Sequence, residues 1–262
     1  MKQLARWIGI WMLAGLMLVA PVAAGAARPD LDISSSQKDQ LKALAANTRD
    51  RTGRERDSLR QARMELMKAY SSYAIDWHRL NGTWARISSA QLSLLNIHLN
   101  NEIALRNILK AEQFKVLRDM MKRRMRDRDM LVIAPPEVEI LDRLPDKRML
   151  DALGVPDEKQ KQLENEPAGG RAIQELRESS KDLLDLYSNY ALESSAARKL
   201  IDNLHRKQVS LLRQQNYRQR QIRKVLTQDQ FQKLQQEIAK RMAERGQKRW
   251  PGERGPRTNR HK

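Results

Sequence analysis

The chain of 262 residues is strongly basic, with 50 Lys and Arg against 32 Asp and Glu and a formal net charge of +18. Only 5% of its residues are aromatic and only 11 are glycine, a composition that disfavours an all-β fold and suits long helices. Cysteine is absent, which excludes disulfide bonds and thiol chemistry, so stability must come from helix packing.

The first 26 residues have the features of a signal peptide. Lys2 and Arg6 precede a short apolar stretch, and small residues around Gly25 follow it, as at a cleavage site. A membrane anchor needs about 20 apolar residues, and this stretch is shorter. We therefore expect residues 1–26 to be removed and the mature protein to be exported, with an uncleaved anchor as the alternative.

The stretch from Ser34 to Trp77 is predicted to be helical. Its apolar residues recur at spacings of three and four, which marks one face of an amphipathic helix. Residues 81–83 (NGT) predict a break, with Thr83 as the cap of the following helix. The corresponding break in the second half of the chain is expected at residues 193–195.

A segment containing three prolines, residues 131–153, opposes a continuous helix and is interpreted as a connector. It separates a first helical unit, residues 27–130, from a second one, residues 154–246. Residues 247–262 are basic and rich in Gly and Pro, so we predict a disordered tail there.

The two units repeat each other in sequence. Residues 226–242 read LTQDQFQKLQQEIAKRM and residues 109–125 read LKAEQFKVLRDMMKRRM, so a shift of 117 aligns them. The same shift aligns residues 187–191 (YSNYA) with residues 70–74 (YSSYA) without a gap. A register held over this length indicates an internal duplication.

Similar helix-start motifs stand at both ends of each unit. Thr227 can cap a helix, and Gln230, three residues later, can complete a capping box. Residues 33–37, 109–113 and 155–159 are variants in which serine, lysine or proline replaces the threonine. Each unit therefore extends from one helix start to a second one about 75 residues later.

This layout resembles the Spy/CpxP family of periplasmic proteins, whose hallmark is a Leu-Thr-x-x-Gln motif at both ends of an all-helical unit. The resemblance covers nearly all of the mature chain. The residues that carry it are Leu109, Gln113, Phe114, Leu226, Thr227, Gln230 and Phe231.

The resemblance implies an all-α fold made of two tandem Spy-like helical units of long amphipathic helices that form an intrachain pseudo-dimer. Spy-like proteins are cradle-shaped homodimers, so two fused copies predict a monomer or a weak homo-oligomer. The implied function is that of a periplasmic ATP-independent chaperone or envelope-stress adaptor. Its partners would be unfolded or partly folded envelope proteins.

A basic, partly apolar stripe on the predicted helices is the candidate client-binding surface. Positive charge attracts acidic segments over about 10 Å at ordinary salt, and methionine adapts to apolar groups of varied shape. A helix core flanked by solvated arginines is the alternative interpretation of this stripe. The candidate residues are Arg60, Arg63, Met67, Tyr70, Arg177, Leu184 and Tyr187.

Two other functions stay open. The CpxP branch implies a regulatory protein that docks on the sensor domain of an envelope-stress histidine kinase, and other relatives are periplasmic metal-binding or metal-resistance proteins. The four histidines, His78, His98, His205 and His261, include no pair within one helical turn, so we predict no dedicated metal site. We expect His98 to be a hydrogen-bonded residue between helices, because its counterpart in the repeat is Gln215.

The sequence lacks a glycine-rich phosphate loop, a Gly-x-Ser-x-Gly elbow and an HExxH motif. We therefore predict neither an enzyme nor a bound cofactor. The positive charge would suit a nucleic-acid binder, but export separates the chain from most nucleic acid, so no such partner is predicted. Anionic lipid or lipopolysaccharide is kept as a partner for the basic tail.

Overall fold

The computed structural model describes residues 32–125, 145–164 and 170–248, and it contains only helices in these ranges. An all-α fold is therefore confirmed for this part of the chain. None of these helices is both long enough and apolar enough to cross a lipid bilayer. The predicted signal peptide, most of the connector and most of the predicted tail lie outside the described residues.

The helices are α3 (Ser35–Tyr70), α4 (Trp77–Ile108), α5 (Ala111–Met125), α7 (Lys147–Ala152), α8 (Asp157–Glu164), α9 (Gly170–Ser188), α10 (Ser194–Val225) and α11 (Gln228–Lys248).

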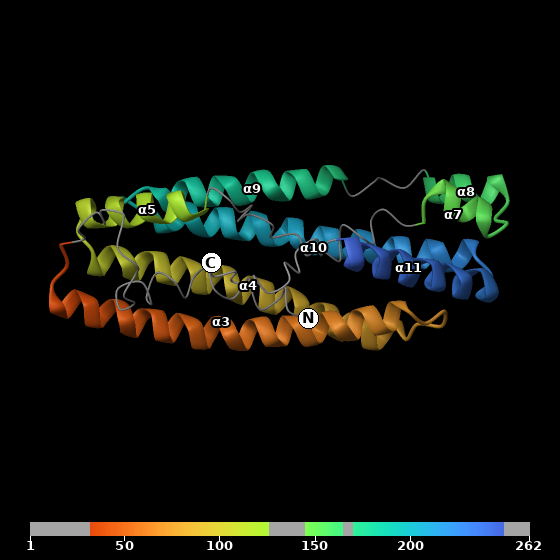
Figure 1. Ribbon diagram of the computed structural model, residues 1–262, viewed down its shortest axis with the longest axis horizontal. Helices are drawn as coiled ribbons and strands as arrows, with labels where there is room; N and C mark the ends of the chain where they lie inside the picture. The colour runs from red at the N-terminus through yellow and green to blue at the C-terminus, as the bar shows by residue number, and fades with distance from the viewer. Residues whose placement is uncertain (1–31, 126–144, 165–169, 249–262) are drawn as a thin grey trace, which may run out of the picture.

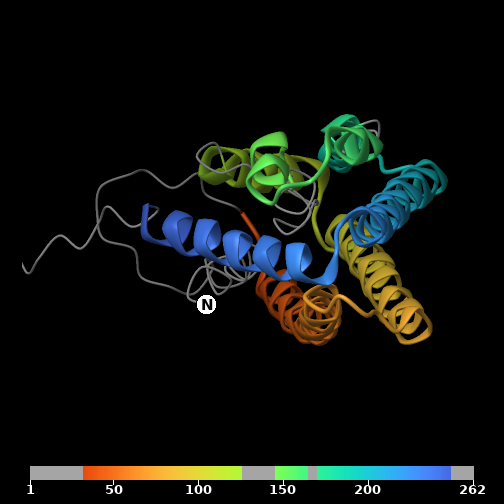
Figure 2. The ribbon, with the colours of Figure 1, turned by 90° about the vertical axis from the view of Figure 1, so that its right-hand side faces the viewer.

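Four long helices lie side by side in the order α3, α4, α10 and α9 (Figure 1). Seen along their length they follow an arc, with α4 and α10 on its outer bend (Figure 2). The shorter helix α5 lies at one end of this row, and α7, α8 and α11 lie at the other end. The molecule is therefore an elongated, curved layer of helices with additional helices at both ends.

Helix bounds in the two halves agree with the shift of 117 residues. Both α4 and α10 have 32 residues, and the shift carries Trp77 and Ile108 onto Ser194 and Val225. The first residues of α5 and α11 are separated by the same interval. The break expected at residues 193–195 lies where α10 begins. Over these helices the repeat in the sequence is also a repeat in secondary structure.

The helix before α4 differs between the halves. In the first half α3 is continuous over 36 residues, and Ser34 and Gln37 form the capping box at its start. In the second half α8 and α9 occupy the corresponding stretch, with the undescribed residues 165–169 between them.

The break predicted at residues 81–83 is wrong, because the turn lies earlier, at residues 71–76. Asp76, not Thr83, caps α4, and its side chain accepts a hydrogen bond from a backbone N–H of the first turn at 3.0 Å. The glycine of the predicted break is exposed within α4 and meets no neighbouring side chain. A single glycine in a helix costs about 1 kcal/mol relative to alanine, which the packing of a 32-residue helix offsets.

The end of the predicted connector is also structured. Residues 147–152 form α7, and its Met149 and Leu150 are only 2% and 1% exposed. They pack against side chains of α10 and α11, so this part of the connector belongs to the core of the second half. Gly154 follows α7 with a φ of 66°, a left-handed conformation that glycine adopts without a Cβ penalty.

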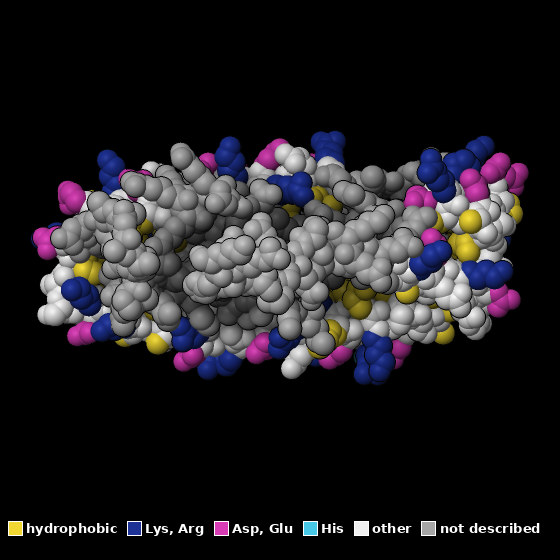
Figure 3. All heavy atoms as spheres, in the orientation of Figure 1, with side chains coloured by type: hydrophobic (Ala, Val, Ile, Leu, Met, Phe, Trp, Pro, Cys, Tyr) yellow, Lys and Arg dark blue, Asp and Glu magenta, His cyan; other side chains and the backbone are white. Residues whose placement is uncertain are grey.

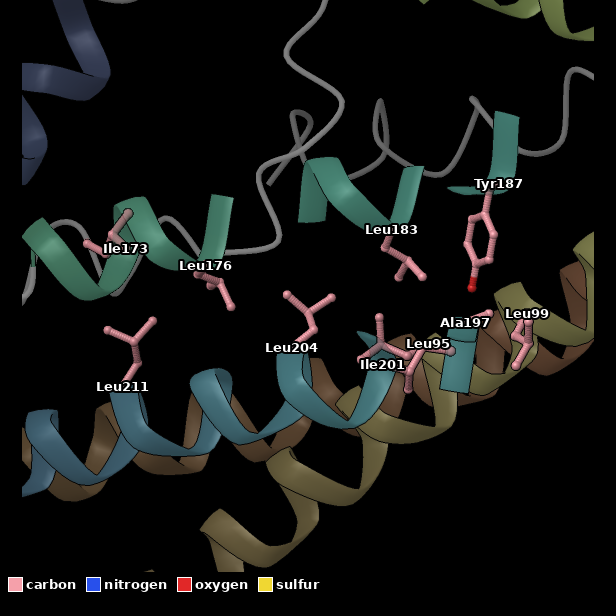
Figure 4. Close-up of a cluster of buried hydrophobic side chains, with 10 residues drawn as sticks. All are labelled: Leu95, Leu99, Ile173, Leu176, Leu183, Tyr187, Ala197, Ile201, Leu204 and Leu211. Carbon is pink, nitrogen blue, oxygen red and sulfur yellow. The ribbon is translucent and has the colours of Figure 1, made fainter. Parts of the chain in front are cut away.

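The core of the second half lies between α9 and α10. Leu176, Leu183 and Tyr187 of α9 point toward Ile201 and Leu204 of α10 (Figure 4). Each of these side chains is at most 4% exposed. Full burial of one such side chain contributes about 1.5–3 kcal/mol, so this cluster holds the two helices together.

An equivalent cluster lies between α3 and α4, and most of its members are 117 residues earlier in the chain. The α9–α10 cluster also includes Leu95 and Leu99 of α4, and the α3–α4 cluster includes Leu212 of α10. Leu95 and Leu212 are themselves equivalent residues, so this exchange between the halves is reciprocal. The shared members of the first-half cluster are Leu59, Leu66, Tyr70, Leu80 and Ile87.

Candidate functional site

The two helix-start motifs of the first half meet at one end of the molecule. The Ser34 N–H donates to Gln37 Oε1 at 3.0 Å, which completes the predicted capping box. Gln37 Nε2 also donates to the carbonyl of Ile108 at 2.7 Å and to Gln113 Oε1 at 3.0 Å. Gln113 in turn donates to the carbonyl of Asp32. The two glutamines therefore fasten the start of α3 to the start of α5.

The motifs of the second half make comparable contacts. The Thr227 N–H donates to Gln230 Oε1 at 3.0 Å, so the capping box predicted for α11 is present. Gln230 Nε2 donates to the carbonyl of Leu153 at 3.1 Å, close to the motif variant that starts α8. Gln160, the residue that follows this variant, donates to the carbonyl of Val155 at 2.7 Å. In both halves a motif glutamine thus bridges two helix starts that are far apart in sequence.

The phenylalanines of the motifs contact tyrosines of the opposite half. Phe114 and Phe231 are each 1% exposed. Tyr190 packs edge-on against Phe114, and Tyr73 packs in the same way against Phe231, with 5.6 Å between ring centroids in both pairs. Each tyrosine hydroxyl donates to the carbonyl of the leucine that begins the motif of the other half, at 2.9 and 3.1 Å.

Arg223 of α10 binds the carbonyl oxygens at the end of α3. Its guanidinium donates to Tyr70 at 2.7 Å, to Ser72 at 2.7 Å and to Tyr73 at 3.0 Å. Another of its N–H groups donates to Gln219 Oε1 at 2.7 Å. Burial lowers the pKa of Arg223 to about 10. The last carbonyls of a helix have no partner within the helix and carry partial negative charge, so a cation stabilises them.

Arg106 of α4 makes the equivalent contacts with the end of α9. It donates to the carbonyls of Tyr187 at 2.8 Å, Asn189 at 2.6 Å and Tyr190 at 2.9 Å. Every one of these residues is 117 positions from its counterpart at the other end of the molecule. We call Arg106 and Arg223 the arginine caps, because each one caps a helix of the half to which it does not belong.

The surroundings of the two arginine caps differ in charge. Glu102 is 0% exposed and forms ion pairs with Arg106, at 2.8 Å, and with Arg118. The equivalents of Glu102 and Arg118 in the second half are Gln219 and Gln235, so the buried charge pair is replaced by two amides. These amides line a small cavity between the end of α3 and α11, whose wall also includes Met67, Tyr70 and Phe231.

Equivalent residues of the two halves also touch each other where α4 meets α10. Ser88 Oγ lies 2.9 Å from His205 Nε2, and these residues are separated by 117 positions. One turn further along, Gln91 and Gln208 are 6% and 5% exposed. Ser88 and His205 are therefore equivalent residues that contact each other across the boundary between the two halves.

The predicted client-binding residues fall into two groups. Arg60 on α3 and Arg177 on α9 are exposed, while Arg63, Met67 and Leu184 are partly buried. These five residues lie on the two outer helices of the row. They are accessible for contact with another molecule to different degrees.

Tyr70 and Tyr187 form the second group and belong to the core instead. They are 3% and 4% exposed, and burial raises the pKa of both hydroxyls. We therefore assign these two tyrosines to helix packing, in line with the alternative interpretation of the stripe. Met64 is not among the predicted client-binding residues, although it is an apolar side chain that lies one turn after Arg60 and is 59% exposed.

Three of the four histidines, His78, His98 and His205, lie in the described ranges. His205 contacts Ser88, and burial together with the charge of Arg56 lowers the pKa of His98 to about 4. Within residues 32–125, 145–164 and 170–248, no group of three or more His, Asp or Glu side chains is arranged to hold a metal ion.

No local pattern in the sequence predicts the arginine caps or the tyrosines that pack on the motif phenylalanines. They could have been found by comparing residues 117 positions apart, because both copies have arginine at positions 106 and 223 and tyrosine at positions 73 and 190. Polar side chains retained at both copies are candidates for a contact made twice.

No family model, no curated protein and no solved structure matches the chain. What the protein does is therefore inferred from its own residues.

Proposed function

We propose that the protein is an ATP-independent periplasmic chaperone or envelope-stress adaptor that holds unfolded proteins on a basic, partly apolar helical surface. In this proposal the chain contains two Spy-like helical units that form a pseudo-dimer within one polypeptide. The observation that carries it is the bridging of paired helix starts by Gln37, Gln113 and Gln230, the glutamines of three of the helix-start motifs.

Reciprocal contacts support the pseudo-dimer. In a twofold interface, residue i of one unit contacts residue j of the other, and j of the first contacts i of the second. The arginine caps follow this rule, as do the pairs Tyr73–Phe231 and Tyr190–Phe114. The contact between Ser88 and His205 fits a twofold axis that passes between α4 and α10.

The composition of the two outer helices, α3 and α9, favours a client-binding surface on them. Figure 3 shows Lys and Arg side chains around the whole outline of the molecule, interspersed with Asp and Glu, so charge alone marks no single site on that face. A client-binding site needs apolar groups beside the charge, and α3 combines Arg60 and Arg63 with Met64 and Met67. On α9, Leu184 is the apolar residue of this surface, two turns after Arg177.

Two physical steps follow from this composition. Arginine attracts acidic segments of a client over the screening length, about 10 Å at 0.1 M salt, and therefore governs the rate of capture. Apolar side chains act only in contact and therefore govern the rate of release. A partly buried Met or Leu contributes about 1 kcal/mol to such a contact, or a roughly fivefold slower release.

Light scattering of a chemically denatured client, without ATP, tests the proposal. The mature protein should suppress aggregation of at least two unrelated clients at a several-fold molar excess. Unchanged aggregation of both clients would refute the chaperone function and leave a regulator of a sensor kinase as the better interpretation.

Variants then locate the surface. Arg60→Ser with Arg177→Ser should slow capture, whereas Met67→Ser with Leu184→Ser should speed release. The matched control is Arg51→Ser with Arg198→Ser, which removes the same charge from two exposed positions outside the proposed surface. Circular dichroism must show an unchanged fold, because Leu184 also packs against the core. Equal effects of the test and control arginine pairs would exclude a defined capture site.

A further inference from the structure

A row of basic residues lies along α10. Lys199, Arg206, Arg213 and Arg220 follow one another at intervals of seven residues, and all four are exposed. Seven residues are close to two helical turns, so the four side chains lie on one line. At about 1.5 Å per residue, neighbours are about 10 Å apart and the row is about 32 Å long. We call these four residues the basic row.

The basic row lies on the side of α10 that is opposite to the packed side. Ile201, Leu204 and Leu211 are each at most 4% exposed and pack against α9 and α4. At 100° per residue, the members of the basic row point about 180° away from these leucines and isoleucine. α10 lies on the outer bend of the arc (Figure 2), and Arg220 at the end of the row stacks on Trp77 of α4.

The charge of the basic row is poorly compensated. Lys199, Arg206 and Arg213 form no ion pair or hydrogen bond with any residue of the described ranges, and Arg220 stacks on Trp77 at 4.4 Å. The single carboxylate of α10 is Asp202. The basic side chains of the whole helix are Arg198, Lys199, Arg206, Lys207, Arg213, Arg218, Arg220, Arg223 and Lys224.

The equivalent helix α4 shows that the fold does not require this charge. At the positions that match the first three members of the basic row, α4 has Gly82, Ser89 and Asn96, which are exposed and uncharged. Both helices have 32 residues. The basic row is therefore a property of the second half alone, which points to an interaction rather than to stability.

We propose that the basic row docks the protein on the surface of an anionic lipid bilayer. A straight line of cations on an outer bend can meet a plane over its whole length, and anionic headgroups supply negative charge wherever the row lands. Tyr217 lies on the same side and is 50% exposed, and tyrosine favours the interface between water and lipid. A duplex nucleic acid is the other class of polyanion that such a row could meet, and the experiment below distinguishes it from a bilayer.

This inference is independent of client binding, because it concerns α10 and not the client-binding residues of α3 and α9. It is also distinct from attraction of the C-terminal tail to lipid. The tail remains present in every protein compared, so it contributes equally to all of them.

Sedimentation with lipid vesicles tests the proposal. The mature protein should bind vesicles that contain about one-third phosphatidylglycerol, and not pure phosphatidylcholine, at about 0.1 M salt. The test variant carries Lys199→Gln, Arg206→Gln and Arg213→Gln, and leaves Arg220 on Trp77. Since each basic residue near an anionic surface contributes about 1 kcal/mol, or about fivefold in partitioning, the three changes should weaken binding by about 100-fold.

The matched control carries Arg49→Gln, Arg51→Gln and Arg54→Gln, three exposed residues of α3 with the same total charge. It should weaken binding by less than about fivefold. Urea midpoints must be equal in the three proteins. Three results would overturn the proposal. The unmodified protein does not bind the anionic vesicles, or the two variants lose vesicle binding equally. In the third, the test variant binds vesicles as the unmodified protein does and binds only duplex DNA or polyglutamate more weakly.

Discussion

Replacing Arg223 by methionine tests whether the arginine caps hold the two halves together. Methionine retains much of the apolar stem and removes the guanidinium, which donates to the carbonyls of Tyr70, Ser72 and Tyr73. It also removes the cation that lies 4.5 Å from the centre of the Phe231 ring. The end of α3 would then lose its charged partner from the other half.

We expect the free energy of unfolding to fall by about 2–4 kcal/mol. A hydrogen bond to a charged donor contributes about 1.5–3 kcal/mol, and the contact with the Phe231 ring adds about 1 kcal/mol. Two effects reduce the sum. Water can replace the donor at the exposed turn residue Ser72, and burial of the guanidinium, which lowers the pKa of Arg223 to about 10, has its own desolvation cost.

Urea denaturation followed by the helical circular dichroism signal measures this loss. Arg213→Met is the matched control, because Arg213 lies on the same helix and is exposed, and it should change stability by no more than about 0.5 kcal/mol. Arg106→Met should cost at least as much as Arg223→Met, because Arg106 makes the equivalent carbonyl contacts and also pairs with the buried Glu102. A loss for Arg223→Met as small as that of the control would show that the caps contribute nothing to the association of the halves.

Two further predictions concern buried titratable groups. Because burial lowers the pKa of His98 from 6.5 to about 4, stability from its neutral imidazole is complete above pH 6.5 and is lost as the pH falls toward 4, by about 2 kcal/mol near pH 5. His98→Gln should therefore reduce the difference between urea midpoints at about pH 7.5 and about pH 5, and an unchanged difference would contradict this. Glu102→Gln should destabilise the protein by about 2–4 kcal/mol, because Arg118 loses its buried carboxylate. Adding Arg118→Gln reproduces the amide pair of the second half and should recover most of this loss in a urea melt; a further loss would count against it.

The repeat allowed much of the fold to be predicted from the sequence. A shift of 117 predicts that helices in the two halves begin and end at equivalent residues, and α4 and α10 do so. The capping boxes at Ser34 and Thr227 were also predicted, because they depend on residues only three positions apart. Local patterns of this kind need no knowledge of how the helices pack.

The burial of individual stripes could not be predicted in this way. Tyr70 and Tyr187 lie at the boundary between the apolar and basic stripes of their helices, and either side could have been the surface. Packing of the second helix of each half decides the matter by covering both tyrosines. The prediction of a break at residues 81–83 is wrong for a related reason. Arg223 binds carbonyl oxygens of the turn at residues 71–76 and so stabilises the break there. One glycine weakens a helix too little to move the break to residue 82.

The arginine caps were beyond any local pattern. Arg223 reads as one of several basic residues on α10, and its function depends on carbonyl oxygens about 150 positions away. Arg223 differs from an exposed neighbour such as Lys224 only because α10 packs against the end of α3 at this point. The same applies to Tyr73, whose hydroxyl reaches Leu226.

The exchange of the arginine caps between halves of one chain has a consequence for variation. In an assembly of two identical chains, each substitution appears at both equivalent positions, so a change that suits one site must be tolerated at the other. A single chain is free of that constraint, and it also keeps its halves together at any dilution because their association is intramolecular. The pair Glu102–Arg118 opposite Gln219–Gln235, and the neutral side of α4 opposite the basic row of α10, are differences that such a chain can accumulate while the shared contacts persist. One half can thus acquire a new surface while the other retains the old one.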